Sequence, residues 1–268
     1  MSGGGRPGLA RGARTAGYLG PMRILVVGAG GLIGRAVMRA ASGCAHDVSG
    51  LDRAACDVTD PRARAAALHN YNPDAVIFCA GFTDVDATSS GDARVNVEAP
   101  LAWAREVPTW WLSSNFVFDG AGPHSPEETP RPNSEYARQK VAAEEAVLRS
   151  GAHVVRVGWV YGPGGRTFAS TVADRLAAGE TVRAVYDVVV QPTHADDVAA
   201  ALLTLPRGVT HVAGGGETSW YGFSLAVWAR TGAGRVVPIR AADLHLGARP
   251  RDGRLFPASL PPWWDRLP

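Results

Sequence analysis

The chain is poor in cysteine, with only Cys44, Cys56 and Cys79 among its 268 residues. Three is an odd number and no two form a Cys-x-x-Cys pair, so the sequence favours neither a disulfide framework nor a cysteine-based zinc site. This usage is typical of a reducing compartment, and we expect a cytoplasmic protein. The sequence also lacks an apolar run long enough to span a membrane, so we expect no membrane association.

Acidic residues are absent from residues 1–21, which contain Arg6, Arg11 and Arg14 among many Gly and Ala residues. The segment has no apolar stretch of the kind found in signal peptides, and we expect a disordered N-terminal extension. Its three arginines exceed the formal net charge of +2, so the rest of the chain is slightly acidic. A nucleic-acid surface therefore has no electrostatic support there, and we expect no nucleic-acid partner.

What is present is a regular alternation of short apolar runs and helix-like segments over residues 22–163. This alternation predicts an α/β fold with a Rossmann-like doubly wound parallel sheet, and the glycine-rich turn within it indicates that this domain binds NAD(P). Beyond residue 163 the pattern loosens. We expect residues 164–268 to form mainly a smaller C-terminal substrate-binding lobe, with part of the chain returning to the sheet.

A glycine-rich turn follows the first apolar run, at Gly28–Gly34, and a helix-like segment comes next. Such a turn lets backbone amides and the positive end of a helix approach a pyrophosphate, which side chains would obstruct. The glycines give G-x-x-G-x-x-G rather than the standard G-x-G-x-x-G. We predict that the dinucleotide contacts Gly28, Gly30, Gly31, Leu32, Ile33 and Gly34.

Two adjacent residues after the second expected strand point to different cofactors. Asp52 lies about 20 residues beyond the turn, where a carboxylate binds the adenosine ribose diol, whereas Arg53 suits a 2′-phosphate. The sequence therefore leaves NADH and NADPH open, with NADPH slightly favoured.

Tyr136 and Lys140 are four residues apart in a segment expected to be helical. That spacing puts the phenol and the ammonium on one helix face. A close ammonium favours the phenolate and so lowers the pKa of tyrosine from its usual value of about 10. We predict that this pair is catalytic.

Taken together and in this order, these motifs resemble the extended short-chain dehydrogenase/reductase superfamily. Within it the chain is similar to dTDP-4-dehydrorhamnose reductase and related nucleotide-sugar 4-ketoreductases. The resemblance runs from about Met22 to the C-terminus. It rests also on Asp57–Pro61, Ala80–Asp86, Val95–Asn96, Ser113–Gly120, Arg156–Gly162, Gln191–Thr193, Gly214–Phe223 and Ala248–Arg251.

The resemblance implies NAD(P)H-dependent reduction of a ketone, above all the 4-keto group of a nucleotide-activated deoxysugar, and a homodimer. Tyr136 would donate a proton to the carbonyl oxygen, Ser114 would hydrogen-bond the same oxygen, and Lys140 would bind the nicotinamide ribose. Further cofactor contacts are expected from Asp57, Val58, Ala80, Gly81 and Asn96. Substrate contacts are expected from Thr83, Val85, Ser114, Asn115, Phe116 and Trp159.

Departures from the family pattern leave the substrate and the reaction open. Asn115 and Phe116 stand where the family has Asp and Tyr, so the substrate need not carry the usual hydroxyl pattern. Asn115-Phe116 also excludes a 4,6-dehydratase, which needs an acidic pair there. A nucleotide-sugar epimerase and a non-catalytic NAD(P)-binding regulatory subunit remain alternatives.

Two further residue groups have both a structural and a functional reading. Trp159 suits either a sugar pocket or the core. His194, Asp196 and Asp197 have the composition of a metal site but match the family's helix start, where acidic residues favour the positive helix end. We expect no metal.

Overall fold

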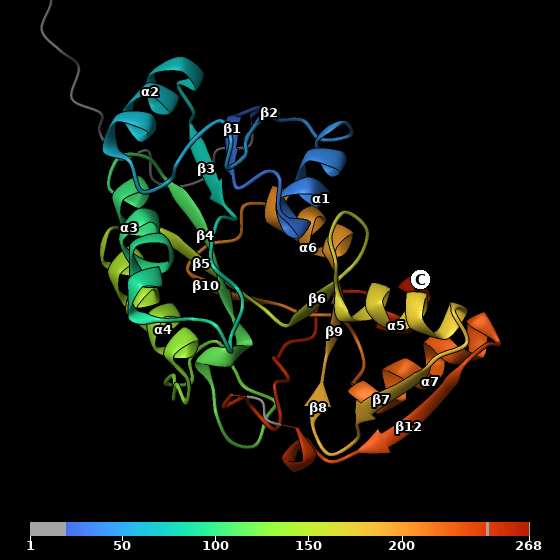
Figure 1. The fold of residues 1–268 in the computed structure, drawn as a ribbon. Coiled ribbons are helices and arrows are strands. Elements are labelled where there is room, and N and C mark those ends of the chain that lie inside the picture. Colours follow the sequence, from blue (N-terminus) through green and yellow to red (C-terminus); the bar gives the residue numbers. More distant parts are fainter. Residues whose placement is uncertain (1–19, 245–246, 268) are drawn as a thin grey trace, which may run out of the picture.

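A six-stranded parallel sheet with the order β10-β5-β4-β3-β1-β2 forms the centre of the computed structural model, which describes residues 20–244 and 247–267 (Figure 1). The predicted extension, residues 1–21, lies outside the described residues except for its last two. The strands are β1 (Arg23–Val27), β2 (Asp47–Leu51), β3 (Ala75–Phe78), β4 (Thr109–Ser114), β5 (His153–Val157) and β10 (Val209–Val212). Every neighbouring pair is parallel, which confirms the predicted Rossmann-like fold class.

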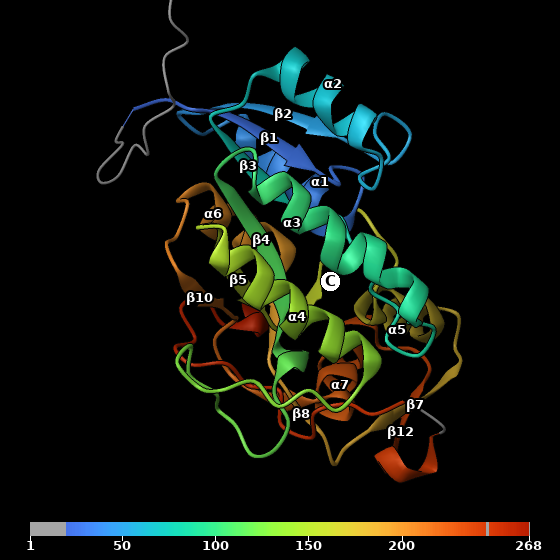
Figure 2. The ribbon, with the colours of Figure 1, turned by 90° about the vertical axis from the view of Figure 1, so that its left-hand side faces the viewer.

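Helices cover both faces of this sheet, as Figures 1 and 2 show. On one face α1 (Leu32–Ala41) and α6 (Ala195–Leu203) pack against the strands. The other face carries α2 (Pro61–Tyr71), α3 (Ala99–Ala104) and α4 (Glu135–Arg149). Strands buried on both faces are mostly apolar, which explains why the apolar runs of β1 and β3 show no alternation.

Local sequence determines where the helices next to the site begin. Asp60 caps α2 by accepting the backbone N–H of Arg62 at 2.8 Å, and Pro61 takes the first position, where no N–H is needed. Ser134 caps α4 by accepting the N–H of Ala137 at 3.2 Å. The cap lies two residues before Tyr136, so α4 begins at the residue that directly precedes Tyr136.

The segment before α3 departs from a regular α-helix. A 3-10 turn at Ser90–Asp92 is followed by a π-helical turn at Arg94–Glu98, in which the N–H of Ala99 donates to the Arg94 carbonyl. Pro100 has no N–H for the Asn96 carbonyl, so the α-helical bond is impossible at this point. Such turns are frequent at functional sites.

A smaller unit adjoins the carboxyl side of the sheet and has its own aromatic core around Tyr161, Phe223 and Trp263. Its helices are α5 (Phe168–Ala177) and α7 (Trp220–Thr231). Its strands form three pairs: β6 (Trp159–Tyr161) with β9 (Pro192–His194), β7 (Thr181–Val185) with β12 (Arg235–Ile239), and β8 (Val189–Val190) with β11 (Thr218–Ser219). Besides Ser90–Asp92, the described residues form 3-10 turns at Asn115–Val117, Ala241–Asp243 and Trp263–Arg266.

Candidate active site

The chain turns sharply at Gly28, between β1 and α1. Gly28 has a φ of +87°, and a Cβ there would lie 2.6 Å from the backbone nitrogen of Ala80. A Cβ on Gly34 would overlap the Gly28 carbonyl oxygen. Both positions therefore require glycine, because the end of β3 and the first turn of α1 pass directly against the turn.

The start of α1 forms a cradle for an anion. Helix geometry leaves the first-turn amides of Leu32, Ile33 and Gly34 without intrahelical acceptors. Gly30 and Gly31, which precede them, are exposed and carry no side chain that could fill the space. Arg35 Nε donates to the Gly30 carbonyl at 2.7 Å and steadies the turn. A pyrophosphate fits this donor set, because the amides and the positive helix end both favour negative charge.

Asp52 and Arg53 lie beside this cradle. A Cβ on Gly30 would be 3.3 Å from the Cβ of Asp52, so the acidic residue borders the turn. Asp52 Oδ1 accepts the N–H groups of Ala54 and Ala55, both at 3.0 Å. Arg53 is exposed. One carboxylate oxygen of Asp52 is thus engaged in the turn, and the exposed Arg53 follows Asp52 directly in the chain.

Asp57 and Val58 have structural contacts of their own. Asp57 Oδ1 accepts the backbone N–H of Thr59 at 2.9 Å and its hydroxyl at 2.8 Å, and these bonds hold the pKa of Asp57 below its usual value. Val58 packs against the core on the α2 and α3 face. Oδ1 of Asp57 thus fixes the turn, while the residue itself is exposed to solvent.

Tyr136, Lys140 and Ser114 meet at the carboxyl end of β4. Ser114 is the last residue of β4, and its hydroxyl accepts the N–H of Phe116 at 3.2 Å. Tyr136 and Lys140 are 6% and 5% exposed and lie on the buried side of α4. Lys140 Nζ donates to the Leu112 carbonyl at 3.0 Å and lies 4.5 Å from the centroid of the Trp111 ring. The three predicted catalytic residues are thus brought together by β4 and α4.

The pKa values of the pair differ from the sequence-based expectation. Burial raises the pKa of Tyr136 to about 12, with the Ser114 hydroxyl acting in the opposite direction. Burial lowers the pKa of Lys140 to about 8, opposed by the charge of Glu144. The predicted lowering of the tyrosine pKa by Lys140 is therefore absent from the protein alone, because desolvation of the phenolate dominates. The phenol is protonated at neutral pH, as a proton donor must be.

The residues that follow β3 lie close to both the glycine turn and Lys140. Ala80 lies against Gly28, and a Cβ on Gly81 would lie 3.5 Å from Asn96 Oδ1 and 3.9 Å from Lys140 Nζ. Asn96 is 1% exposed and its Oδ1 accepts the N–H of Phe82 at 2.8 Å. Small residues at 80 and 81 leave room between the glycine turn and Lys140. The predicted cofactor residues of β1, β3 and α4 therefore border one space.

The residues predicted to contact substrate differ in their surroundings. Thr83 is exposed and Val85 half-buried in the loop that follows β3. Phe116 packs edge-on against Tyr136, with ring centroids 5.7 Å apart. Asn115 is buried, and its Nδ2 donates to the Gly253 carbonyl at 2.8 Å. The Asn115 side chain therefore anchors the C-terminal segment, whereas Phe116 places an apolar surface next to the phenol.

Trp159 belongs to an aromatic cluster at the start of β6. Its ring centroid lies 4.4 Å from Trp220, 4.9 Å from Phe223 and 5.4 Å from Phe168. It is nevertheless half-buried. One part of the ring packs in the core of the smaller unit and the rest is accessible. The two predictions for Trp159, a core residue and a residue of a sugar pocket, therefore do not exclude each other.

The acidic and histidine residues at the start of α6 are tied to other groups. Asp196 lies 2.5 Å from Arg39, and Asp197 lies 2.8 Å from Arg266. His194 Nδ1 accepts the N–H of Asp196 at 3.3 Å and so caps the helix. Ion pairs and the cap account for these side chains.

The sequence analysis did not identify three polar residues behind the predicted catalytic pair: Gln139, Glu144 and Arg156. Glu144 forms a buried ion pair with Arg156, with N···O distances of 2.9 and 2.7 Å. Residues 136, 140 and 144 share one helix face by their four-residue spacing. That spacing could have indicated that Glu144 lies on the same face as Tyr136 and Lys140. Gln139 gave no comparable pattern, because it contacts residues that are distant in sequence.

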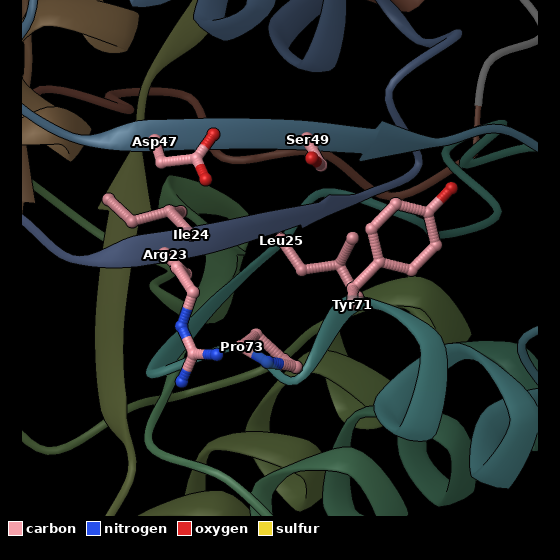
Figure 3. Close-up of a pocket in the computed structure, with 7 residues that line it drawn as sticks. All are labelled: Arg23, Ile24, Leu25, Asp47, Ser49, Tyr71 and Pro73. Atoms are coloured by element: carbon pink, nitrogen blue, oxygen red, sulfur yellow. The ribbon is translucent and has the colours of Figure 1, made fainter.

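A small cavity of about 20 Å³ lies elsewhere in the central unit (Figure 3). It is lined by the first residues of β1 and β2 and by the end of α2, including Arg23, Asp47 and Tyr71. The glycine turn follows the opposite ends of these strands. Ligands in open α/β sheets bind at the carboxyl ends, so this cavity is separate from the candidate active site.

Among the described residues, no helix combines the length and the apolar character needed to cross a bilayer.

Comparison with known proteins agrees with this geometry. The family model described as RmlD substrate binding domain matches residues 22–259. A probable dTDP-4,6-dihydroxy-2-methyloxan-3-one 4-ketoreductase of Streptomyces antibioticus is 34% identical over 247 residues, covering 85% of this chain and 84% of the relative. A dTDP-4-dehydrorhamnose reductase of Mycobacterium tuberculosis is 37% identical over 246 residues, covering 82% and 80%.

Solved structures show the same fold. A dTDP-4-dehydrorhamnose reductase from Bacillus anthracis in complex with NADP has a TM-score of 0.86 at 22% identity, covering 92% of this chain and 97% of that one. An orthologue from Clostridium acetobutylicum has a TM-score of 0.85 at 25% identity, covering 91% and 96%. With the family model spanning most of its length, the chain belongs to the RmlD substrate binding domain family, and the predicted resemblance to the dTDP-4-dehydrorhamnose reductases is confirmed.

Proposed function

We propose that this protein reduces the 4-keto group of a nucleotide-activated deoxysugar with a reduced nicotinamide dinucleotide. The observation that carries the proposal is the convergence of Ser114, Tyr136 and Lys140 beside the glycine turn. The two relatives above, a 4-ketoreductase and a dTDP-4-dehydrorhamnose reductase by name, support the substrate class.

The cofactor site is proposed from the cradle at the start of α1. The amides of Leu32, Ile33 and Gly34 would hold the pyrophosphate, Asp52 or Arg53 the adenosine ribose, and Lys140 the nicotinamide ribose. A reduced nicotinamide bound there supplies the hydride that the reaction needs. Asp52 favours NADH and Arg53 favours NADPH, and we propose that the enzyme accepts both.

The chain's own residues supply the proton and the orientation. A carbonyl that accepts hydride develops negative charge on its oxygen, and a positioned proton donor lowers that barrier. Tyr136, protonated because burial raises the pKa of its phenol, gives its proton to that oxygen. Ser114, whose hydroxyl opposes that rise, donates a second hydrogen bond that orients the carbonyl. Lys140 places a positive charge close to the phenolate that remains.

Phe116 narrows the substrate class. Its ring stands 5.7 Å from the Tyr136 ring and has no hydroxyl to offer, and the neighbouring Asn115 amide is bound to Gly253. Ser114 and the Asn115 Oδ1 that its hydroxyl contacts at 3.3 Å are polar, whereas the Phe116 ring gives the phenol one apolar side. We propose a substrate with a deoxygenated carbon or methyl group on this side.

The test is oxidation of NADH and NADPH over a panel of nucleotide 4-ketosugars, with wild type, Tyr136→Phe and Lys140→Ala. Tyr136→Phe keeps the ring and removes the proton, so kcat should fall by about 10²–10⁴-fold while cofactor binding persists. Stoichiometric oxidation of added cofactor distinguishes a reductase from an epimerase. No turnover by folded, cofactor-binding wild type on any substrate would favour the non-catalytic subunit instead.

A further inference from the structure

Gln139 is a buried amide on the catalytic helix that the proposed chemistry does not use. It directly precedes Lys140 and is 4% exposed. Its Oε1 accepts from Asn96 Nδ2 at 2.9 Å, and its Nε2 donates to the Ser89 carbonyl at 2.7 Å and to Glu135 Oε1 at 3.1 Å. A buried amide is costly unless its hydrogen bonds are made, and here they connect three separate segments.

The orientation of the two amides is fixed by their outer partners. The N–H of Phe82 can only donate, so Asn96 turns its oxygen toward Phe82 and its Nδ2 toward Gln139. The Ser89 carbonyl can only accept, so Gln139 turns its Nε2 toward Ser89. A flip of either amide would break the bonds at both ends.

Phe82 and Ser89 are the two ends of the loop that follows β3. This loop leaves the sheet at its carboxyl edge, where open α/β sheets bind their ligands. It starts next to Lys140, since a Cβ on Gly81 would lie 3.9 Å from Lys140 Nζ. Its middle is tied to the C-terminal segment, where Arg249 binds Asp86 with N···O distances of 2.6 and 2.8 Å. The loop therefore spans the site between the two units.

We propose that Gln139 is a positioning residue: with Asn96, it clamps both ends of the loop 82–89 so that the substrate is held in register with Tyr136. This inference rests on the proposed function, because the register matters only for a substrate that accepts the Tyr136 proton. Gln139 lies on the same helix as Tyr136, so the clamp fixes the position of the loop relative to the proton donor. Reaction rates depend on the position of the substrate relative to the proton donor, since a misplacement of about 1 Å can lower the rate about 100-fold.

Three variants separate the clamp from the stability of α4. Gln139→Leu has similar volume and loses every hydrogen bond. Gln139→Glu keeps the acceptor for Asn96 but, when ionised, loses the donor for Ser89 and repels Glu135. Arg138→Ala is the matched control, because the described contacts of the Arg138 side chain are with half-buried Glu135 alone, through Oε2 at 3.1 Å, whereas Gln139 binds Glu135 through Oε1.

Steady-state kinetics should be measured per cofactor-binding site, so that unfolded protein does not count. Gln139→Leu should raise KM for the ketosugar and lower kcat/KM by roughly 10–100-fold, with the affinity for NADPH within about twofold of wild type. Gln139→Glu should recover toward wild type as pH falls, because a protonated carboxyl regains a donor for Ser89. Wild-type KM and kcat in both variants would overturn the proposal.

Hydrogen exchange without cofactor or substrate supplies a readout independent of activity. Peptides covering residues 82–89 should exchange faster in Gln139→Leu than in wild type or Arg138→Ala, whereas β1 and α6 should be unchanged. Unchanged exchange of the loop overturns the clamp whatever the activity. Inactive wild type with faster loop exchange in Gln139→Leu would instead overturn the proposed function and leave the clamp in place.

Discussion

The guanidinium of Arg156 and the carboxylate of Glu144 form a two-point ion pair in which each residue is only 3% exposed. Glu144 lies one helical turn beyond Lys140, and Arg156 lies on β5, so the pair fastens α4 to the sheet. Arg156 also donates to the Pro126 carbonyl at 3.1 Å and so holds the loop that leads into α4. The ion pair therefore has both a packing role and an electrostatic role toward Lys140.

Loss of one partner of this pair should be strongly destabilising. Glu144→Leu and Arg156→Met each leave a buried charge without its counterion and should lower the free energy of unfolding by about 3–5 kcal/mol. The double variant should recover much of that loss, because two apolar side chains need no counterion. Urea unfolding of all four proteins measures the coupling. Additive single effects would contradict a specific pair.

The pH dependence of catalysis should report Lys140. Burial lowers its pKa to about 8, and the charged form is the one that favours the phenolate. Since the ammonium loses its proton above that pKa, kcat/KM should decline as pH rises through about 8. In Lys140→Arg this alkaline decline should vanish, because guanidinium does not titrate in this range. A decline at the same pH in both proteins would assign it to another group.

Acid should destabilise the protein through His211. Its Nε2 accepts from Arg156 Nη1 at 3.3 Å and its Nδ1 donates to the Phe256 carbonyl at 3.0 Å, an arrangement that requires the neutral ring. Burial first, and then the charge of Arg156, lower its pKa from 6.5 to about 4, while Glu127 acts in the opposite direction.

The direction in which stability changes with pH follows from proton uptake by His211. Between pH 6.5 and 4 the unfolded histidine is protonated and the folded one is not. The stabilisation is complete above pH 6.5 and is lost as pH falls through this window, by about 3 kcal/mol in all. His211→Asn keeps a donor for Phe256 and cannot titrate, so its urea midpoint should depend less on pH over this range. Equal pH dependence in both proteins would rule His211 out as the source.

Gly34→Ala should abolish the cofactor site. The new Cβ would overlap the Gly28 carbonyl oxygen, and neither the turn nor α1 can yield without moving the other. Overpacking of this kind costs about 1–3 kcal/mol or more. Gly43→Ala is the control, since its Cβ would have only the Ala40 oxygen at 4.0 Å. NADPH fluorescence should show binding in Gly43→Ala and none in Gly34→Ala, and the thermal midpoint should fall only in Gly34→Ala.

The features that the sequence predicted correctly depend on local chemistry. The glycine turn follows from backbone geometry within seven residues. The parallel sheet follows from apolar runs separated by helix-length segments. In each case the residues that decide the structure are neighbours in the chain, so their pattern is visible without coordinates.

What the sequence did not predict depends on contacts between distant residues. The sequence predicted Asn115 beside the substrate, and it gave no sign that the Asn115 amide also binds Gly253, 138 residues away. The pKa of Tyr136 was expected to be lowered, but burial, which depends on the whole fold, raises it. Gln139 gave no signal, because its partners Asn96 and Ser89 come close only after α4 has packed against the sheet.

The position of β10 at the outer edge of the central sheet, although it follows α5 and β7 of the smaller unit in the chain, limits how this protein can move and change. The polypeptide leaves the sheet after β5, comes back with α6 and β10, and leaves again toward β11. Several segments of the polypeptide therefore connect the two units, and a hinge motion between the units would have to bend all of these segments together. Neither unit corresponds to one continuous stretch that could be excised or exchanged between proteins. A new substrate preference in this family is thus expected to arise by point substitutions within the site rather than by replacement of a module.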